Sequence, residues 1–551
     1  MSSTTNYKRR QFLQYSAGAA AASFLPQVLL AQTNTVKSRA SANFHPDVEI
    51  EFTTRNAFAP IFQQGPKTAV FKYNAHVLKG PQNTVLPLKN NYLGPILNFI
   101  KGQKIRIYFN NKLDEPSVIH WHGLHVPQKS DGHPMYAIQP GEQFVYEFEV
   151  KNRAGTSFYH SHTHERTATQ VYKGLAGLIQ ITDDEEQKLD LPSGEYDIPM
   201  VLQDRSFNSR NQLTYLRGMR NRVMGFLGEQ ILVNGKPNMR FDVKTRAYRF
   251  RVLNGSNSRI YKLGWEDGTP LIAMGTDAGL LEKPVSKPYF MLAPGERVEL
   301  WLDFSGRKVG SELVMYSLPH SGTMPMMYER MHGRGGMGMG MMGGRRGGMG
   351  MMSGGIPQGS KFKIASFHIS KKVTDSPTLP SHLVNIPRLT ERDVDNANNP
   401  IPIALRMMPI MSPRLNGMSF SMNRVIPLEE VELGSIKKIK IFHEQMGHMG
   451  RGGMGMMGGG MGGMMSMAHP IHLHGQQYQV LSRKMTGSRQ DAYATVKDGF
   501  INEGWKDTVL VMPGEQVEII KPFQDYKGLF LYHCHNLEHE DLGMMRQFYV
   551  G

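Results

Sequence analysis

The only cysteine of this 551-residue chain lies near the C-terminus, in the sequence Gly528-Leu-Phe-Leu-Tyr-His533-Cys534-His535-Asn-Leu-Glu-His539-Glu-Asp-Leu-Gly-Met544. The apolar and aromatic residues before His533 are good strand formers, so we expect the chain to enter this motif as a β-strand. Successive side chains of a strand point to opposite faces. His533 and His535 should therefore face one way and Cys534 the other, so that one short strand serves two metal sites.

Cys534, His539 and Met544 offer a thiolate, an imidazole five residues on and a thioether ten residues on. Two histidines, a cysteine and a weak axial methionine form the ligand set of a blue-copper site. The sequence therefore predicts that one further imidazole comes from elsewhere in the chain, together with partners for His533 and His535.

Three other segments supply these imidazoles: His120-Trp121-His122-Gly123, His160-Ser161-His162 and His469-Pro470-Ile471-His472-Leu473-His474-Gly475. On a strand, each His-x-His pair projects both rings to one face, which suits a metal ion better than a hydrophobic core. A single pair is more often explained by a buried histidine bonded to a carbonyl. Four pairs, with His469 left over to join the cysteine site, favour metal binding. Structural zinc closes with four ligands and needs no such set.

Length and composition limit the architecture. A chain of this length predicts about three domains of roughly 150 residues, and the frequent aromatic, β-branched, Gly and Pro residues favour an all-β fold. The formal net charge is +16, but the basic residues are scattered and resemble no nucleic-acid-binding module, so we expect no nucleic-acid partner. A lone cysteine excludes an internal disulfide framework.

The N-terminal residues predict a targeting segment. Lys8-Arg9-Arg10-Gln11-Phe12-Leu13 precedes an alanine-rich apolar run to Leu30 and small residues at Ala40-Ser41-Ala42. The Arg-Arg-x-Phe-Leu core resembles a twin-arginine signal, which implies export of the folded protein to the bacterial periplasm. A membrane anchor is the alternative, but the run is short for a span, so we expect no stable anchor in the mature form.

Turn-rich and low-complexity segments suggest the domain limits. We predict a signal and leader over residues 1–42, a first domain over 45–185, a second over 193–370, a linker over 371–400 and a third domain over 401–551. The second domain has no His-x-His pair, and we expect it to act as a spacer. Two methionine-rich stretches, 324–352 and 446–467, carry 20 of the 38 methionines and should form surface loops, because glycine-rich sequence buries little.

Over essentially the whole mature chain, the sequence resembles the multicopper oxidases. The motifs that carry the resemblance are His-Trp-His-Gly, His-Ser-His, His-Pro-Ile-His-Leu-His-Gly and His-Cys-His-x3-His-x4-Met. The resemblance implies three cupredoxin-like Greek-key β-barrel domains and four copper ions, one type 1, one type 2 and two type 3. It implies the following ligands: His469, Cys534, His539 and Met544 for type 1; His120 and His472 for type 2; His122, His160 and His535 for one type 3 ion; and His162, His474 and His533 for the other. A related scaffold protein has lost these ligands, whereas this chain keeps them.

The resemblance also implies catalytic roles. Type 1 copper would accept single electrons, and the other three ions would reduce dioxygen to water. Asp131 and Glu540 match acidic positions proposed as proton donors. The alternative for Asp131 is an ordinary Asp-Gly turn, and for Glu540 a solvated or structural carboxylate.

The reducing substrate is the most open question. The methionine-rich stretches resemble those of periplasmic cuprous oxidases, since neutral thioethers suit Cu(I). Met467 matches a substrate-copper position, and Met465 stands where those relatives have Asp. Cu(I) oxidation for copper tolerance is therefore the first prediction. A laccase or bilirubin-oxidase type enzyme acting on small phenols or pigments is the alternative, and a copper-sequestering protein without catalysis is a third. We expect a monomer.

Overall fold

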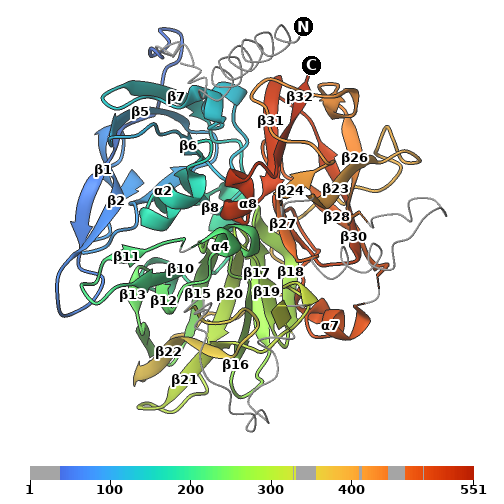
Figure 1. Cartoon of the computed structure of the whole chain (residues 1–551). Coiled ribbons are helices and arrows are strands. Elements are labelled where there is room, and N and C mark those ends of the chain that lie inside the picture. Colours follow the sequence, from blue (N-terminus) through green and yellow to red (C-terminus); the bar gives the residue numbers. More distant parts are fainter. Residues whose placement is uncertain are drawn as a thin grey trace, which may run out of the picture. The chain divides into compact units, whose positions relative to one another are not determined.

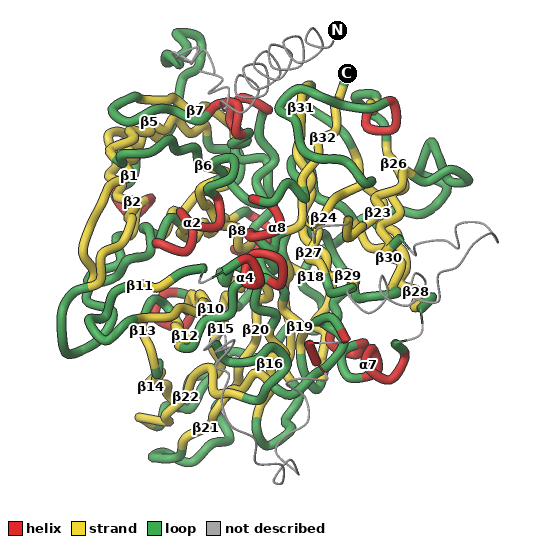
Figure 2. The backbone as a smooth tube through the Cα atoms, in the orientation of Figure 1, coloured by secondary structure: helices red, strands yellow, loops and turns green. Residues whose placement is uncertain are grey.

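Strands are the main regular structure of the described chain, and helices are few and short (Figures 1 and 2). The computed structural model describes residues 38–551 except 217, 327, 330–354, 409–411, 445–465 and 488. The all-β prediction is therefore confirmed.

The described strands form six sheets, and one strand order recurs in three of them. In each of these three sheets, one strand has an antiparallel neighbour on one side and a parallel neighbour on the other. The parallel neighbour then pairs with a further antiparallel strand. The first of these sheets contains β2 (Thr68–Lys79), β1 (Val48–Ala59), β5 (Lys104–Lys112) and β7 (Gln143–Glu149). The second contains β13 (Lys236–Pro237), β12 (Gln230–Val233), β10 (Asp197–Phe207), β15 (Ala247–Asn254), β20 (Arg297–Asp303), β17 (Leu271–Thr276) and β18 (Gly279–Lys287), with β11 (Leu213–Thr214) beside β10. The third contains β24 (Ser412–Leu415), β23 (Ile401–Met408), β26 (Ile436–His443), β30 (Glu515–Pro522) and β28 (Gln479–Met485).

The other three sheets also share an order, in which a parallel pair is followed by antiparallel neighbours. The first contains β3 (Val85–Leu86), β4 (Ile96–Ile100), β9 (Ala176–Thr182), β8 (Gly155–Ser161) and β6 (Ile119–His120). The second contains β14 (Arg240–Lys244), β22 (Phe362–Lys371), β21 (Glu312–Ser317), β16 (Tyr261–Trp265) and β19 (Phe290–Leu292). The third contains β25 (Glu430–Val431), β32 (Met545–Val550), β31 (Gly528–Cys534), β27 (His469–Leu473) and β29 (Thr508–Val511). The fold thus repeats one two-sheet unit three times along the chain.

Alternating side chains explain why these segments become half-buried strands. In β1, Val48, Ile50 and Phe52 are buried, while the residues between them are partly exposed. Fully burying one such side chain contributes about 1.5–3 kcal/mol to folding. A strand that is covered on both faces lacks this alternation, and all eight residues of β15 are buried.

Helices connect strands rather than forming layers. The described helices are α2 (Thr167–Lys173), α3 (Asp184–Gln187), α4 (Met219–Met224), α7 (Gln490–Ala494) and α8 (Leu537–Asp541). Six further single-turn 3-10 helices are η1 (Gln82–Thr84), η2 (Gln128–Ser130), η3 (Pro134–Tyr136), η4 (Gly194–Tyr196), η5 (Pro427–Glu429) and η6 (Lys497–Gly499). Residues 372–400, within the predicted linker, contain no helix or strand, but Leu383 and Val384 pack against Trp301. The domain limits stay a prediction.

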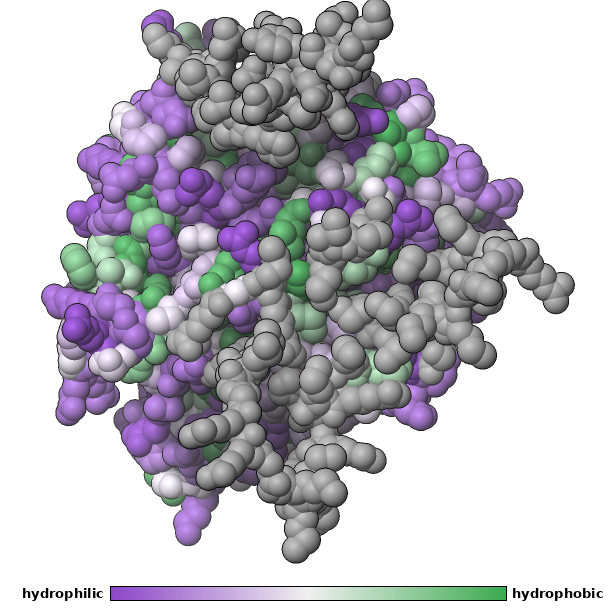
Figure 3. Space-filling view, in the orientation of Figure 1, coloured by the Kyte–Doolittle hydropathy of each residue, from purple (hydrophilic) through white to green (hydrophobic). Residues whose placement is uncertain are grey.

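On the visible face, the described surface is mainly hydrophilic, with small hydrophobic areas (Figure 3). Among the described residues, no helix is both long and apolar enough to cross a membrane. Residues 1–37 of the predicted signal and leader, and most of both methionine-rich stretches, lie outside the described residues.

Candidate metal centre

Strand ends in two sheets position the histidine pairs. The antiparallel strands β6 and β8 place His120 directly opposite His160. In the other sheet, β27 and β31 place His472 opposite His533. The second histidine of each pair, His122, His162, His474 or His535, follows just past the end of its strand. The ends of four strands therefore position the four His-x-His pairs.

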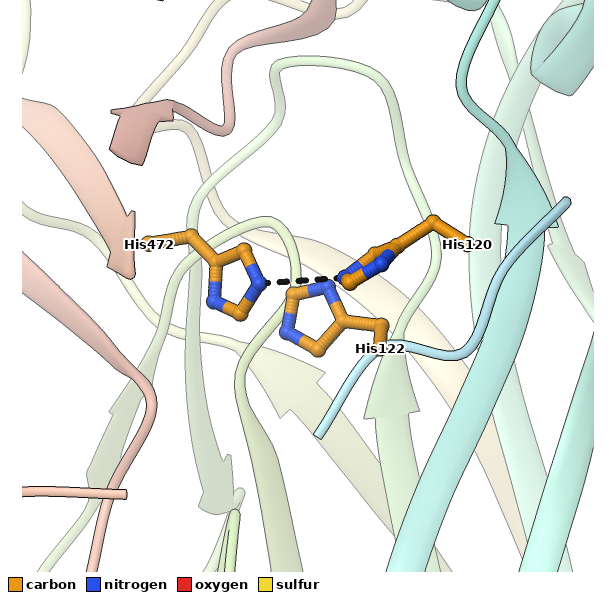
Figure 4. A group of neighbouring side chains, drawn as sticks. All are labelled: His120, His122 and His472. Carbon is orange, nitrogen blue, oxygen red and sulfur yellow. Dashed lines mark hydrogen bonds between the residues drawn. The ribbon is translucent and has the colours of Figure 1, made fainter. Parts of the chain in front are cut away.

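The eight rings converge on one buried region. They form three groups in which one ligand atom from each residue lies within 4.8 Å of the others: His120, His122 and His472; His122, His160 and His535; and His162, His474 and His533. In the first group, His120 and His472 approach from opposite sides and their Nε2 atoms are 3.3 Å apart (Figure 4). The His122 ring stacks on His472 with centroids 3.6 Å apart.

Burial favours the neutral form of several of these rings. Burial and the neighbouring imidazoles lower the pKa of His120, His122, His474 and His535 well below the ordinary value. Burial also lowers the pKa of His160 to about 4. A neutral imidazole has one nitrogen lone pair available to a metal ion.

Unpartnered ring nitrogens indicate what the cluster can hold. Within the described part of the chain, His122 Nδ1, His160 Nε2, His162 Nδ1 and both nitrogens of His535 are buried without a hydrogen-bond partner. Buried polar atoms are normally satisfied, and leaving them bare is costly. Metal ions would satisfy these lone pairs, so the residues present fit a metal cluster.

A separate group surrounds the cysteine. His469, Cys534 and His539 have ligand atoms within 4.8 Å of one another, and Cys534 Sγ is 3.4 Å from His469 Nδ1 and 3.7 Å from His539 Nδ1. Met544 is fully buried, its N–H donates to the His539 carbonyl, and its carbonyl accepts from Cys534 N–H. Burial raises the pKa of the Cys534 thiol, so metal binding must displace a proton. Imidazole with thiolate is a ligand set that copper takes.

Helix α8 fixes the second imidazole of this group. The Asn536 side chain caps the helix by accepting from His539 N–H. His539 Nε2 is 2.8 Å from the carbonyl of Val223 in α4, so this nitrogen donates and Nδ1 faces the thiol. In Figure 1, α8 lies beside α2, and the Asp541 carboxylate accepts from the N–H groups of Thr167 and Ala168 at the start of α2.

Asp131 occupies a turn, but its side chain is not an ordinary surface group. Gly132 follows it at φ +85°, as an Asp-Gly turn predicts. The Asp131 carboxyl is buried, and one oxygen accepts from His474 Nδ1 at 2.8 Å. Its backbone carbonyl accepts from His120 Nδ1. Burial raises the pKa of Asp131 well above its ordinary value.

Glu540 is also buried and faces histidines rather than solvent. One carboxylate oxygen lies 3.1 Å from His533 Nδ1 and the other 3.6 Å from His162 Nε2. Burial opposes ionisation of this group, but the interaction with His162 and His533 outweighs it and lowers the pKa of Glu540 to about 2. The interpretation of Glu540 as a solvated carboxylate is therefore wrong.

Sequence analysis did not identify two residues beside the cluster, of which one contacts a histidine directly and the other acts through it. Asp507 accepts from His122 Nε2 at 3.0 Å, and Arg297 forms a bidentate pair with Asp507. Both are isolated charged residues in ordinary strand and turn contexts. The glycine that follows His122 is the one local signal, because a side chain there would collide with Arg297.

The candidate substrate residues are only partly described. Met465 lies outside the described residues. Met467 is buried in a cluster with Met324 and Tyr328, against which Met224 of α4 packs.

The fold and the site define a class of protein, one built from repeated two-sheet β units whose buried histidine and cysteine groups fit metal ions. The multicopper oxidase profile matches residues 69–186 and 459–551. The chain is 29% identical to the multicopper oxidase of Staphylococcus aureus, over 86% of this chain and 85% of that protein. It is 28% identical to the laccase of Bacillus subtilis, over 90% of this chain and 93% of that one. The crystal structure of the McoA multicopper oxidase of Aquifex aeolicus covers 92% of this chain and 97% of its own, with 30% identity and a TM-score of 0.71.

The chain belongs to the multicopper oxidase family. Both the cupredoxin-like fold and the enzyme class predicted from the sequence are confirmed. Enzymes of this class use dioxygen and a reducing substrate.

Proposed function

We propose that the chain holds four copper ions and oxidises Cu(I) to Cu(II) with dioxygen. The proposed type 1 ligands are His469, Cys534, His539 and Met544. The proposed type 2 ligands are His120 and His472. The proposed type 3 ligands are His122, His160 and His535 for one ion and His162, His474 and His533 for the other.

One observation carries the copper assignment. Residues 533–535 contribute to three of the compact groups: His533 and His535 to two histidine groups and Cys534 to the group with His469 and His539. The thiol and both imidazoles are thus consecutive in one chain segment. Cys534 is bonded through the main chain to His533 on one side and His535 on the other. This direct covalent path joins the proposed electron-accepting site to the two histidine groups that would face dioxygen.

Copper would supply one-electron exchange with the substrate and a site for reducing dioxygen. The balanced reaction is 4 Cu(I) + O2 + 4 H+ → 4 Cu(II) + 2 H2O, so the protein must deliver four protons per dioxygen. Asp131 is suited to hold one, because burial favours its neutral form and its Oδ1 has no hydrogen-bond partner in the described structure. Glu540, which faces His533 and His162, is the second proposed proton carrier, and its low pKa means that it is ionised until a proton reaches it.

The methionine cluster supports Cu(I) as the substrate. Met224, Met324 and Met467 pack in one cluster, and Met467 lies two residues before His469. Ala468 N–H donates to the Thr323 carbonyl at 2.9 Å, so the start of the first methionine-rich stretch lies beside the end of the second. Soft, neutral sulfur favours Cu(I).

A laccase-type oxidase of phenols or pigments is the second candidate. It is favoured by the likeness to a protein named a laccase at 28% identity over nine-tenths of both chains. The same copper groups would serve either reductant. The two candidates therefore differ only in whether Cu(I) or a phenol reaches the His469 side of the protein.

Two further proposals concern the location of the protein and its oligomeric state. We propose export to the periplasm, supported by the twin-arginine-like sequence at Arg9 and Arg10. We also propose a monomer, since every proposed ligand comes from one chain.

Oxygen uptake tests the substrate. Initial rates should be measured with Cu(I) and with dimethoxyphenol, each with and without excess Cu(II). A higher kcat/KM for Cu(I) is expected. A phenol rate that exceeds the Cu(I) rate in both conditions would favour the laccase-type candidate, and no uptake with either would favour sequestration.

A further inference from the structure

Asp507 connects two imidazoles of the cluster through two different groups. Its carboxylate lies 3.0 Å from His122 Nε2, and its backbone carbonyl lies 2.9 Å from His472 Nδ1. The two rings stack on one another, 3.6 Å apart and 15° from parallel. Both Asp507 groups are acceptors, so both ring nitrogens must donate.

Opposite tautomers follow for the two stacked rings. In His122 the proton is on Nε2, which leaves the lone pair on Nδ1, and this buried atom has no hydrogen-bond partner in the described chain. In His472 the proton is on Nδ1, which leaves the lone pair on Nε2, facing His120 (Figure 4). Asp507 thereby selects which nitrogen each ring offers, and the Thr508 hydroxyl lies 3.2 Å from the same two protonated nitrogens.

Arg297 holds Asp507 in place. Its Nη1 and Nη2 donate to the two carboxylate oxygens of Asp507 at 2.8 and 2.5 Å. The other contacts of the guanidinium are Nε to the Thr156 carbonyl at 3.0 Å, Nη1 to the Gly295 carbonyl at 2.8 Å and Nη2 to the Asp277 carbonyl at 2.5 Å. Arg297 is fully buried. A lysine could not reproduce this planar, five-donor geometry.

The glycine of the His-Trp-His-Gly motif makes room for this pair. A Cβ at Gly123 would lie 2.6 Å from Arg297 Nη2 and 2.9 Å from the Asp507 carboxylate. Gly123 also has φ +89°, where other residues are strained. The backbone therefore passes directly over the Arg297–Asp507 pair just after His122.

We infer that Arg297 and Asp507 are positioning residues that fix the ring orientation and tautomer of His122 and His472 for metal binding. Arg297 begins β20, in the part of the chain predicted to act only as a spacer. That segment therefore contributes to the cluster through Asp507. The inference rests on the proposed copper ligands, since only bound metal makes the choice of nitrogen matter.

The test compares Arg297→Lys and Asp507→Asn with the parent in the full-length, copper-loaded protein. Arg297→Lys keeps the buried positive charge but loses the bidentate contact. Copper per chain is measured by mass spectrometry after graded chelator treatment. The blue absorption of the Cys534 site serves as an internal measure of folded protein, and electron paramagnetic resonance reports the non-blue Cu(II). Residues outside the ligand set that orient metal-binding histidines typically change affinity by about 10–100-fold.

Arg251→Lys is the matched control. Arg251 is equally buried and pairs with Asp197 and Glu299, but within the described structure neither carboxylate bonds to a histidine, as Asp507 does. We expect Arg297→Lys and Asp507→Asn to release the non-blue coppers at about 10–100-fold lower chelator concentration, with altered resonance parameters and unchanged blue absorption. Arg251→Lys should behave like the parent.

Three results have distinct meanings. Parent-like copper retention in Arg297→Lys would overturn the inference. Equal copper loss in Arg251→Lys and Arg297→Lys would do the same, because it would show general destabilisation. If the parent itself holds copper only at Cys534, the proposed function fails instead. Should Asp507→Asn not fold, the Arg297→Lys comparison still decides.

Discussion

His472 on β27 lies directly opposite His533 on β31, as antiparallel partners in one sheet. The same relationship joins His120 on β6 to His160 on β8 in a different sheet. Two cross-strand pairs, each extended by a second histidine beyond the strand end, bring eight imidazoles together with little loop structure. Because strands hold the cluster on both sides, its geometry should persist without metal.

Cys534→Ser tests the link between the thiol and the proposed type 1 copper. The variant should lose the blue absorption and the oxidase activity while keeping the non-blue coppers, because the histidine groups do not use the thiol. Absorption spectra and copper per chain check this. A variant that remains blue would show that Cys534 is not the ligand.

Met544→Leu should keep a blue site but raise its reduction potential, since removing a weak axial donor favours Cu(I). A rise of about 60 mV would correspond to a tenfold shift in a one-electron equilibrium. Redox titration followed by absorption gives the value. Met545→Leu is the matched control, because Met545 is also buried but pairs with His533 across the strands. If both variants have the same reduction potential as the parent, Met544 is not a copper ligand.

Asp131→Asn should slow reoxidation by dioxygen at least about tenfold, since a positioned proton donor typically contributes 10²–10⁴-fold. Reduction of the blue site by substrate should change little. Stopped-flow measurement separates the two half-reactions. Asp541→Asn is the control, because Asp541 follows Glu540 in the chain but its carboxylate accepts backbone N–H groups of α2. Equal slowing of both half-reactions would indicate that Asp131 has a structural role and does not supply a proton.

The sequence predicted the parts of the molecule that repeat a pattern. Pairs such as His120-x-His122 and the single Cys534 are recognisable because their spacing and rarity are unusual. The contribution of Arg297 was missed because its contact with Asp507 spans 210 positions and is made by two common residue types. For Asp131, the sequence predicted the turn but could not show that the carboxyl points inward. The candidate Met465 stays untested.

Lys521 gives the protein a pH-dependent stability. Burial lowers the pKa of Lys521 to about 7, despite the attraction of Asp131 and Asp507. In the unfolded chain the ordinary value is near 10.5. Between these values the unfolded state binds more protons, so the free energy of unfolding should rise with pH, by at most about 1.4 kcal/mol per unit.

Lys521→Met should remove this rise. Urea unfolding of the copper-free proteins from pH 6 to 10 should show the parent gaining stability relative to the variant above about pH 7, with a constant difference below it. Lys308→Met, which alters an exposed lysine, should parallel the parent. A parent–variant difference that stays flat across the range would mean that Lys521 remains charged in the folded protein.

The double variant Met324→Leu/Met467→Leu tests the methionine cluster as the Cu(I) site. Leucine preserves volume and apolar burial, so the free energy of unfolding should change by less than about 1.5 kcal/mol per site. Removing two thioethers should lower kcat/KM for Cu(I) by about tenfold or more, while the rate with dimethoxyphenol stays unchanged, because a phenol gains nothing from sulfur. Met315→Leu, a fully buried methionine in the core built on β15 and β20, is the control for stability and activity. Loss of copper or of folding would lower both activities together, so only a selective decrease supports the site. If the double variant oxidises Cu(I) as well as the parent, these thioethers do not receive the substrate, and phenol oxidation becomes the stronger candidate.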